Sequence, residues 1–302
     1  MESWSMRVDA LVYHVASGRA FFSGMILLVV TVGILAWLPE DSRWRRRMAI
    51  PIILGLLLIA LSATPLPWWL YGVTGSVFAA WIIIESCTAA TSRKIRLASR
   101  LLVLAVLLGA AAWEAPYHLA PRIDADNIRA VAVIGDSVTA GIGEDEAVTW
   151  PEMLRNTHGI TIHDHAKMGA TVSSALEQGE LLTPNDGIVI LEIGGNDLLS
   201  GTSPEDYEQG LEKLLKEVAI PGRTAIMFEL PLPPTFNRYG LIQRRLAEQY
   251  QVHLIPKRVL MGILTEENAT LDSIHLSQAG HARMASIIWK LIQPAFPAAR
   301  RE

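Results

Sequence analysis

Residues 129–141 read RAVAVIGDSVTAG, a short run rich in β-branched and small apolar residues that ends in Gly-Asp-Ser. From here on, short apolar runs alternate with segments whose apolar residues have helical spacing. The run at 187–193, GIVILEI, is almost continuously apolar, which is typical of a strand covered on both faces. The expected strands are 129–134, 160–163, 187–193, 224–230 and 252–255, and the expected helices are 149–156, 172–179, 204–219, 237–250 and 277–292. This alternation predicts an α/β fold: a flavodoxin-like α/β/α sandwich with a five-stranded parallel sheet.

Three polar motifs lie at strand ends or before the last helix, where ligands gather in parallel sheets. The Gly-Asp-Ser at 135–137 can present a serine hydroxyl beside a helix N-terminus. The Gly-Gly-Asn-Asp at 194–197 can offer a carboxamide N–H to an oxyanion. In the Asp-Ser-Ile-His at 272–275, the acid can hold the imidazole so that its other nitrogen takes a proton from serine. A turn or a charged surface explains each motif alone, but together they predict a nucleophile, an oxyanion donor and a base with its orienting acid.

With these motifs, residues 130–295 resemble the SGNH, or GDSL-type, serine hydrolase family. The family's serine, asparagine and final blocks match GDSVTAG, GGND and DSIH, and its glycine block is matched best by Gly169 in HAKMGAT. The stretches VILEIGGNDLLSG and PLPPTFNRYG look most like the thioesterase I, lysophospholipase and arylesterase branch. Two positions depart from the family pattern: Val138 replaces the leucine of the family name, and Leu276 follows the histidine where proline is common.

The resemblance implies both a fold and a site. It implies the SGNH hydrolase fold, with Ser137 as nucleophile, His275 as base and Asp272 as the residue that orients the base. It also implies an oxyanion hole made by the backbone amides of Ser137 and Gly169 and the side chain of Asn196. We therefore expect a serine esterase or lipase that hydrolyses carboxylic esters or thioesters through an acyl-enzyme, with no cofactor.

Apolar residues beside the motifs are candidates for a substrate-binding acyl groove, although ordinary loop packing explains them equally well. They are Leu198, Leu199, Ile274 and Leu276.

The polar residues outside these motifs give weaker evidence for a functional site. His163 and His165 alternate around Asp164, but no Cys, Asp or Glu pattern supports a metal site, and we expect none. His281 is expected to be a packing or surface residue, and Asp136 and Asp197 are expected to hold their loops.

The first 121 residues have a different composition. The chain of 302 residues is 51% hydrophobic with a mean hydropathy of +0.30, and residues 20–115 hold few charges outside two basic clusters. We expect a membrane region at 1–121, followed by the hydrolase domain at 122–302. About four transmembrane helices are expected, near 20–39, 48–64, 68–86 and 97–115.

Two of these helices need further argument. The uncharged run 48–84 would be about 55 Å long as one helix, so Pro65 and Pro67 are taken to divide it; a re-entrant hairpin stays open. The last helix has only thirteen uncharged residues between Arg100 and Glu114. It spans if Arg100 snorkels to one surface and Glu114 lies at the other, and is otherwise a buried or interfacial helix.

Charge sets the predicted orientation. Two helices separate the two basic clusters, so both fall on one face, and the positive-inside rule makes that face cytoplasmic. The clusters are Arg43, Arg45, Arg46 and Arg47, and Arg93, Lys94, Arg96 and Arg100. We expect an integral protein of the bacterial inner or plasma membrane, its N-terminus and hydrolase domain on the periplasmic or extracellular side. An interfacial aromatic belt is expected at Trp37, Trp68, Trp69, Trp81 and Trp113.

The net charge of −4 gives no electrostatic case for a nucleic-acid partner, and the single cysteine excludes an internal disulfide. The expected partner is an ester substrate, either a lipid or an envelope glycan, while protein partners are not predicted. Two alternatives stay open: an O-acyl esterase or acyltransferase acting on envelope polysaccharide, and a non-catalytic subunit of a membrane complex.

Overall fold

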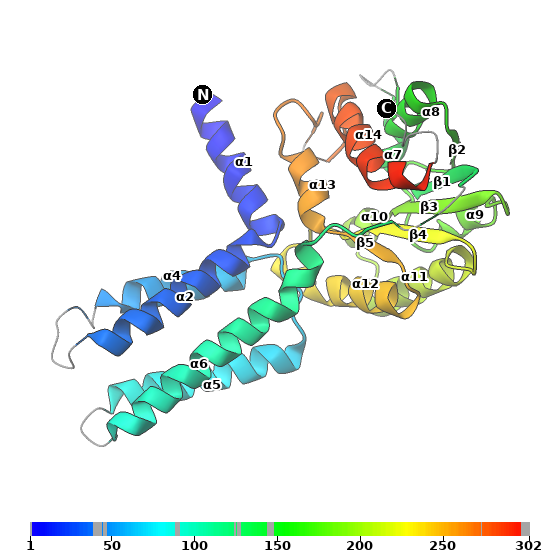
Figure 1. Ribbon diagram of the computed structural model, residues 1–302. Helices are drawn as coiled ribbons and strands as arrows, with labels where there is room; N and C mark the ends of the chain where they lie inside the picture. The colour runs from blue at the N-terminus through cyan, green and yellow to red at the C-terminus, as the bar shows by residue number, and fades with distance from the viewer. Residues whose placement is uncertain are drawn as a thin grey trace. The chain divides into compact units, whose positions relative to one another are not determined.

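The computed structural model shown in Figure 1 has two compact units. The sheet unit comprises Met1–Tyr13, Leu119–Pro231 and Arg238–Glu302, and the helical unit comprises His14–His118 and Leu232–Asn237. The residues that the structure describes are 2–38, 44, 47–87, 91–123, 125, 128–143, 148–272 and 274–296.

The sheet unit is built on five parallel strands in the order β2-β1-β3-β4-β5. The strands are β1 (Ala130–Gly135), β2 (Thr161–Asp164), β3 (Asp186–Glu192), β4 (Thr224–Phe228) and β5 (His253–Ile255). Val131 of β1 is in register with Ile162 of β2 on one side and Ile188 of β3 on the other. This order is the flavodoxin-like winding, so the predicted fold is confirmed. The order reverses between β1 and β3, where such sheets open a crevice at their carboxyl ends.

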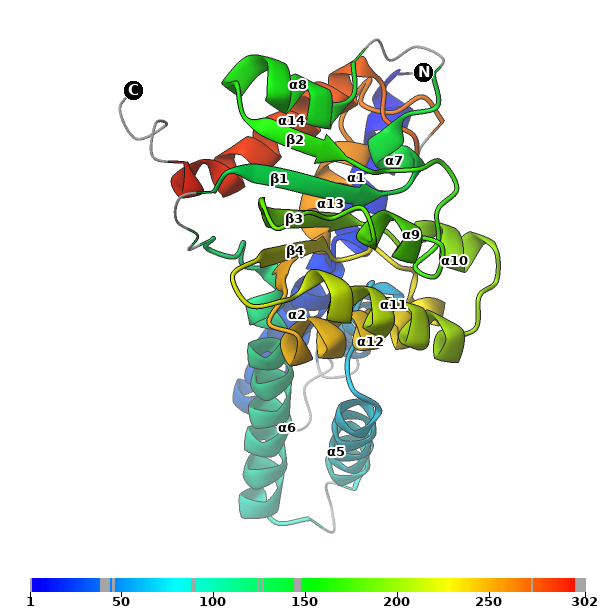
Figure 2. The ribbon, with the colours of Figure 1, turned by 90° about the vertical axis from the view of Figure 1, so that its right-hand side faces the viewer.

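Helices cover both faces of the sheet (Figure 2). One face carries α8 (Trp150–His158), α13 (Lys257–Leu264) and α14 (Gln278–Ile292). The other carries α9 (Leu176–Gly179), α11 (Pro204–Val218) and α12 (Asn237–Gln249). The shorter helices of this unit are α7 (Ser137–Ala140), α10 (Gly195–Leu199) and η3 (Gln293–Ala295), while η2 (Pro234–Phe236) belongs to the helical unit. Helix α13 was not predicted, and the helix expected at 172–179 shrinks to α9.

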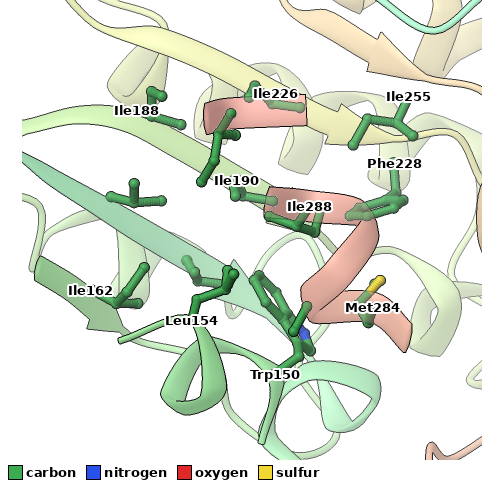
Figure 3. Close-up of a cluster of buried hydrophobic side chains, with 14 of the residues drawn as sticks. Trp150, Leu154, Ile162, Ile188, Ile190, Ile226, Phe228, Ile255, Met284 and Ile288 are labelled. Carbon is green, nitrogen blue, oxygen red and sulfur yellow. The ribbon is translucent and has the colours of Figure 1, made fainter. Parts of the chain in front are cut away.

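The core under α8 and α14 fixes the sheet (Figure 3). Trp150 of α8 and Ile288 of α14 pack against alternate strand residues such as Ile190 and Phe228, and all four are fully buried. Residues on the other face of the same strands, such as Leu191, are equally buried, which explains the continuous apolar pattern of β3. Burying each such side chain stabilises the fold by about 1.5–3 kcal/mol.

The helical unit contains four long apolar segments. They are α2 (Arg19–Trp37), α4 (Ala49–Leu61), α5 (Trp68–Ser86) and α6 (Arg93–Glu114), the last continued by η1 (Ala115–His118). Among the described residues, α2, α5 and α6 with η1 are long and apolar enough to cross a membrane, whereas α4 has only 13 residues. Helix α1 (Glu2–Ala16), which precedes them, was not predicted.

Helix α4 ends three residues before the predicted Thr64. Ser62 leaves the helix with extended backbone, and its Oγ accepts a hydrogen bond from the Phe21 N–H at 3.1 Å. The same N–H also donates to the Gly18 carbonyl at 3.2 Å, so Ser62 provides a second acceptor in the first turn of α2. Pro65 disfavours helical geometry at Thr64 in any case. The end of α4 is therefore set by a contact with α2 as well as by the prolines.

Helix α6 begins at Arg93 after the N-cap Ser92, four residues earlier than expected, and ends at Glu114. Within it, the Nε and Nη2 of Arg100 donate to the two carboxylate oxygens of Glu85 at 2.6 and 3.0 Å, a pairing that was not predicted. Glu114 is buried within the protein, with an oxygen 3.3 Å from Nε2 of His118.

The tryptophans expected in an aromatic belt differ in exposure. Trp37, Trp68, Trp69 and Trp113 are exposed near helix ends, whereas Trp81 is buried against Phe78 and does not face outward. Of the first basic cluster, Arg43, Arg45 and Arg46 lie outside the described residues.

Candidate active site

Ser137 stands at the carboxyl end of β1, as the first residue of α7. Asp136 caps this helix, because its Oδ1 accepts the N–H of Val138 at 2.9 Å. The turn is also tied to β3, since the Asp136 N–H donates to the carbonyl of Glu192 at 3.2 Å. A strand end, a cap and a neighbouring strand thus fix the serine, which is almost fully buried.

His275 and Asp272 complete a hydrogen-bonded chain with Ser137. Nε2 of His275 lies 3.0 Å from the Ser137 Oγ, and Nδ1 lies 2.7 Å from Oδ2 of Asp272. The other carboxylate oxygen of Asp272 accepts the N–H groups of His275 and Ile274 at 2.9 and 3.1 Å. These bonds, led by the one from the His275 N–H, lower the pKa of Asp272 to about 2. The acid is therefore ionised at neutral pH and can hold the Nδ1–H tautomer, which leaves Nε2 to accept a proton.

The loop that carries Gly169 is anchored on β1. The Lys167 N–H donates to the Gly135 carbonyl at 3.1 Å, and the Ala170 N–H closes a turn onto the Lys167 carbonyl. Gly169 has a φ of +75°, which favours glycine, and an added Cβ would meet nothing within 4 Å. This backbone is thus exposed beside the end of the strand that leads to Ser137.

Asn196 links the serine loop to the Gly169 loop. It lies in α10, directly after β3, and its side-chain Nδ2 is 3.2 Å from Oδ2 of Asp136 and 3.0 Å from the Ala170 carbonyl. The amide nitrogen, and not the oxygen, therefore faces the residues next to Ser137 and Gly169. All three polar motifs predicted from sequence meet at this edge of the sheet, with Ser273 alone lying outside the described residues.

Asp136 and Asp197 hold loops, as expected. Asp197 is buried, and its Oδ2 accepts the Val172 N–H at 2.9 Å, tying α10 to the segment after Gly169. Burial raises the pKa of both carboxyl groups.

The four apolar candidates separate by exposure. Leu199 is 74% exposed and Ile274 45% exposed, Leu198 is half-buried, and Leu276 is only 1% exposed within the core. Leu276 is thus a core residue rather than part of a groove. Met168, which directly precedes Gly169, is a further exposed apolar residue that was not singled out from the sequence.

His163 and His281 have structural partners. Nδ1 of His163 lies 2.6 Å from Asp186, and buried His281 accepts the Trp150 N–H at 3.2 Å, which makes it a packing residue. The described part of the chain holds no group of three or more metal-ligating side chains.

Sequence reasoning missed the buried glutamate under the serine loop. Glu192 ends β3, and its Oε2 accepts the hydroxyl of Thr139 at 3.1 Å. The available signal was a single acid within the apolar run GIVILEI, because an unpaired carboxyl group is costly in a sheet covered on both faces.

Comparison with known proteins shows which proteins the chain is similar to. Residues 133–283 match the GDSL-like Lipase/Acylhydrolase family. An arylesterase from Vibrio mimicus is 30% identical over 138 residues, which cover 41% of this chain and 68% of that protein. The thioesterase 1/protease 1/lysophospholipase L1 of Escherichia coli K12 is 25% identical over 171 residues, which cover 54% of this chain and 82% of that protein. The crystal structure of TesA aligns with a TM-score of 0.48 at 23% identity, over 55% of this chain and 99% of that one.

The chain belongs to the GDSL-like lipase/acylhydrolase family, also known as the SGNH hydrolases. It is a GDSL-type carboxylic ester hydrolase, with the hydrolase domain in its C-terminal part.

Proposed function

We propose that the protein is a membrane-anchored serine esterase in which Ser137, His275 and Asp272 act as nucleophile, base and orienting acid. The observation that carries the proposal is the hydrogen-bonded chain from Ser137 through His275 to an ionised Asp272. The position of the Asn196 amide between the Ser137 and Gly169 loops supports its role as an oxyanion donor.

The reaction runs in two steps. Ser137 Oγ attacks the ester carbonyl carbon while His275 Nε2 takes the hydroxyl proton. The resulting oxyanion is met by the backbone N–H groups of Ser137 and Gly169 and by the side-chain N–H of Asn196. The bond to the leaving alcohol or thiol then breaks, and His275 protonates that group. Water, deprotonated by His275, attacks the acyl-serine, and the carboxylic acid leaves with Ser137 restored.

An ester or thioester with an apolar acyl chain is the proposed substrate class. Exposed apolar side chains accompany each motif: Met168 beside Gly169, Leu199 in α10 with Asn196, and Ile274 beside His275. Such side chains are normal singly, but their association with the motifs favours contact with an acyl chain. The relatives named for thioesterase, lysophospholipase and arylesterase activities fit the same class.

The helical unit is proposed to anchor the enzyme, with the hydrolase domain on the outer side of a bacterial plasma membrane. Three helices of membrane length support the anchor. Sidedness requires α4 to cross as well, and its 13 residues span only about 20 Å. If α4 did not cross, the two basic clusters would fall on opposite faces, against the positive-inside rule. Local bilayer thinning can accommodate such a short helix. A topology reporter fused after residue 122 should report from the outer side, and a cytoplasmic signal would overturn this orientation.

Replacing the proposed nucleophile tests the chemistry. In the full chain purified in detergent, Ser137→Ala should abolish hydrolysis of p-nitrophenyl esters while the melting temperature stays close to that of the wild type. Full residual activity in a folded Ser137→Ala protein would contradict the assignment.

A further inference from the structure

Two buried carboxyl groups adjoin the serine loop, and one of them, Asp136, contacts the Asn196 amide. Asp136 follows β1 and Glu192 ends β3, the adjacent strand, and both are at most 3% exposed. The two carboxyl groups interact with each other. Burial raises the pKa of both groups, and the charge of Asp136 adds to the rise at Glu192, so the pair favours a single negative charge with one shared proton.

The proton belongs on Glu192. Burial and the neighbouring Asp136 carboxylate raise the pKa of Glu192 well above its usual range. Asp136 is better provided with donors, because its two oxygens accept the Val138 N–H and the Asn196 amide. Burial raises the pKa of Asp136 too, but the Val138 N–H opposes that shift. A protonated Glu192 then donates its O–H to the Asp136 carboxylate.

Glu192 is itself held in one orientation. Its Oε2 accepts the Thr139 hydroxyl at 3.1 Å, and Thr139 in turn accepts the indole N–H of Trp150 at 3.3 Å. Thr139 and Trp150 are both fully buried. The Thr139 hydroxyl donates its proton to Glu192. The Glu192 carboxyl group therefore has a fixed hydrogen-bond donor on one side and Asp136 on the other.

The connection to chemistry passes through Asn196. Both protons of its Nδ2 have acceptors, the Asp136 carboxylate at 3.2 Å and the Ala170 carbonyl at 3.0 Å. An oxyanion must replace one of them. The bond to a carboxylate is charge-assisted and therefore the stronger of the two. The oxyanion then replaces the Ala170 carbonyl as acceptor of one Nδ2 proton, while the bond to Asp136 holds the Asn196 amide in its orientation.

We propose that Glu192 is a positioning residue for the reaction: through Asp136 it holds the Asn196 amide in the orientation that receives the oxyanion. The inference rests on the proposed oxyanion role of Asn196. Glu192 touches neither substrate nor Ser137 in this scheme. Its loss should lower kcat and leave KM nearly unchanged, because the oxyanion forms only in the transition state.

A double-mutant cycle on the full chain in detergent, with p-nitrophenyl butyrate as the probe, tests this. Glu192→Met removes the hydrogen bonds at similar volume, and Glu192→Gln keeps an N–H for Asp136 and an oxygen for Thr139. We expect Glu192→Met to lower kcat about tenfold or more, since losing one oxyanion donor costs on the order of a hundredfold. We expect Glu192→Gln to stay within about threefold of the wild type, and KM to change by less than about twofold in both. In an Asn196→Ala background, Glu192→Met should have almost no further effect on kcat.

The possible failures can be told apart. Equal kcat values for the Met and Gln variants, or a Glu192→Met loss that adds in full to that of Asn196→Ala, would overturn the inference. A normal kcat for Asn196→Ala would contradict the proposed oxyanion role and the inference with it. If Glu192→Met does not fold, as judged by melting, Glu192→Asp takes its place in the cycle. It keeps the acid but draws it one methylene back from Asp136, and the same loss and the same non-additivity are expected.

Discussion

The two units of this chain use apolar side chains in opposite ways. In the sheet unit they line both faces of a parallel sheet, and the exposed exceptions include Met168, Leu199 and Ile274 beside the catalytic motifs. In the helical unit, α2, α4, α5 and α6 all present large apolar side chains outward, such as Val30 and Ile53. An apolar exterior is stable in lipid and unfavourable in water. Exposed apolar side chains therefore have to be interpreted with the solvent that each unit is proposed to meet: Met168, Leu199 and Ile274 accompany the catalytic motifs, and the outward apolar residues of the helical unit fit the proposed anchor.

Asp272→Asn should produce the largest effect, and only in the sheet unit. An amide at this position offers an N–H toward Nδ1 of His275 and so favours the wrong tautomer. We expect kcat to fall on the order of 10²–10⁴-fold. The melting temperature should hardly move, because the Asp272 side chain is half exposed. A kcat within threefold of the wild type would show that His275 does not depend on this acid.

Breaking a buried ion pair should lower the free energy of unfolding more in the sheet unit than in the helical unit. In the sheet unit, Glu229 meets Arg244 at 2.6 Å and Lys257 at 3.5 Å, with all three side chains buried. Glu229→Gln leaves two cations without this counter-charge and should destabilise the unit by about 3–5 kcal/mol. It should do so without changing kcat of the folded fraction.

The matching change in the helical unit is Glu85→Gln, opposite Arg100. Arg100 can extend toward an interface once released, so the expected loss is smaller, about 1–2 kcal/mol. Thermal melting of the purified variants measures both losses. Equal losses of stability in the two variants would mean that both ion pairs are buried in the same way, against this prediction.

A matched pair of lysine substitutions tests the solvent of each surface directly. Val30 in α2 and Leu181 in the sheet unit are 51% and 52% exposed. Val30→Lys should cost about 2.5–3.5 kcal/mol of membrane insertion, because the position lies in the apolar span. Leu181→Lys should be neutral within about 0.5 kcal/mol. Alkaline extraction of membranes measures the inserted fraction, and equal behaviour of the two variants would refute the anchor.

The smallest expected effect concerns acyl-chain contact. Leu199→Ser should raise KM for a decanoyl ester about three- to tenfold and leave an acetyl ester unchanged. Ile220→Ser, at an exposed apolar position in the loop after α11, is the control and should alter neither. A chain-length series of p-nitrophenyl esters decides the question, and a uniform change across the series would remove Leu199 from the acyl site.

The features that could be predicted from the sequence are those that depend on local patterns of residues. Strands such as β3 were predicted because both of their faces are buried, and Ser137, Asn196 and His275 because each follows a strand or precedes a helix. What escaped prediction depends on partners far along the chain. Helix α4 ends where Ser62 bonds to Phe21, and Glu192 meets Asp136, which follows the neighbouring strand β1. The pairing of Arg100 with Glu85 was not predicted either, because it requires α5 and α6 to be packed together.

Trapping the serine tests the central claim most directly. The full chain should be incubated with a fluorophosphonate, and the modified residue located by peptide mass spectrometry. A single phosphonate adduct on Ser137 is predicted, formed far more slowly in His275→Ala and absent in Ser137→Ala. An active enzyme that carries no adduct, or one that carries it on another serine while hydrolysis stops, would contradict the account.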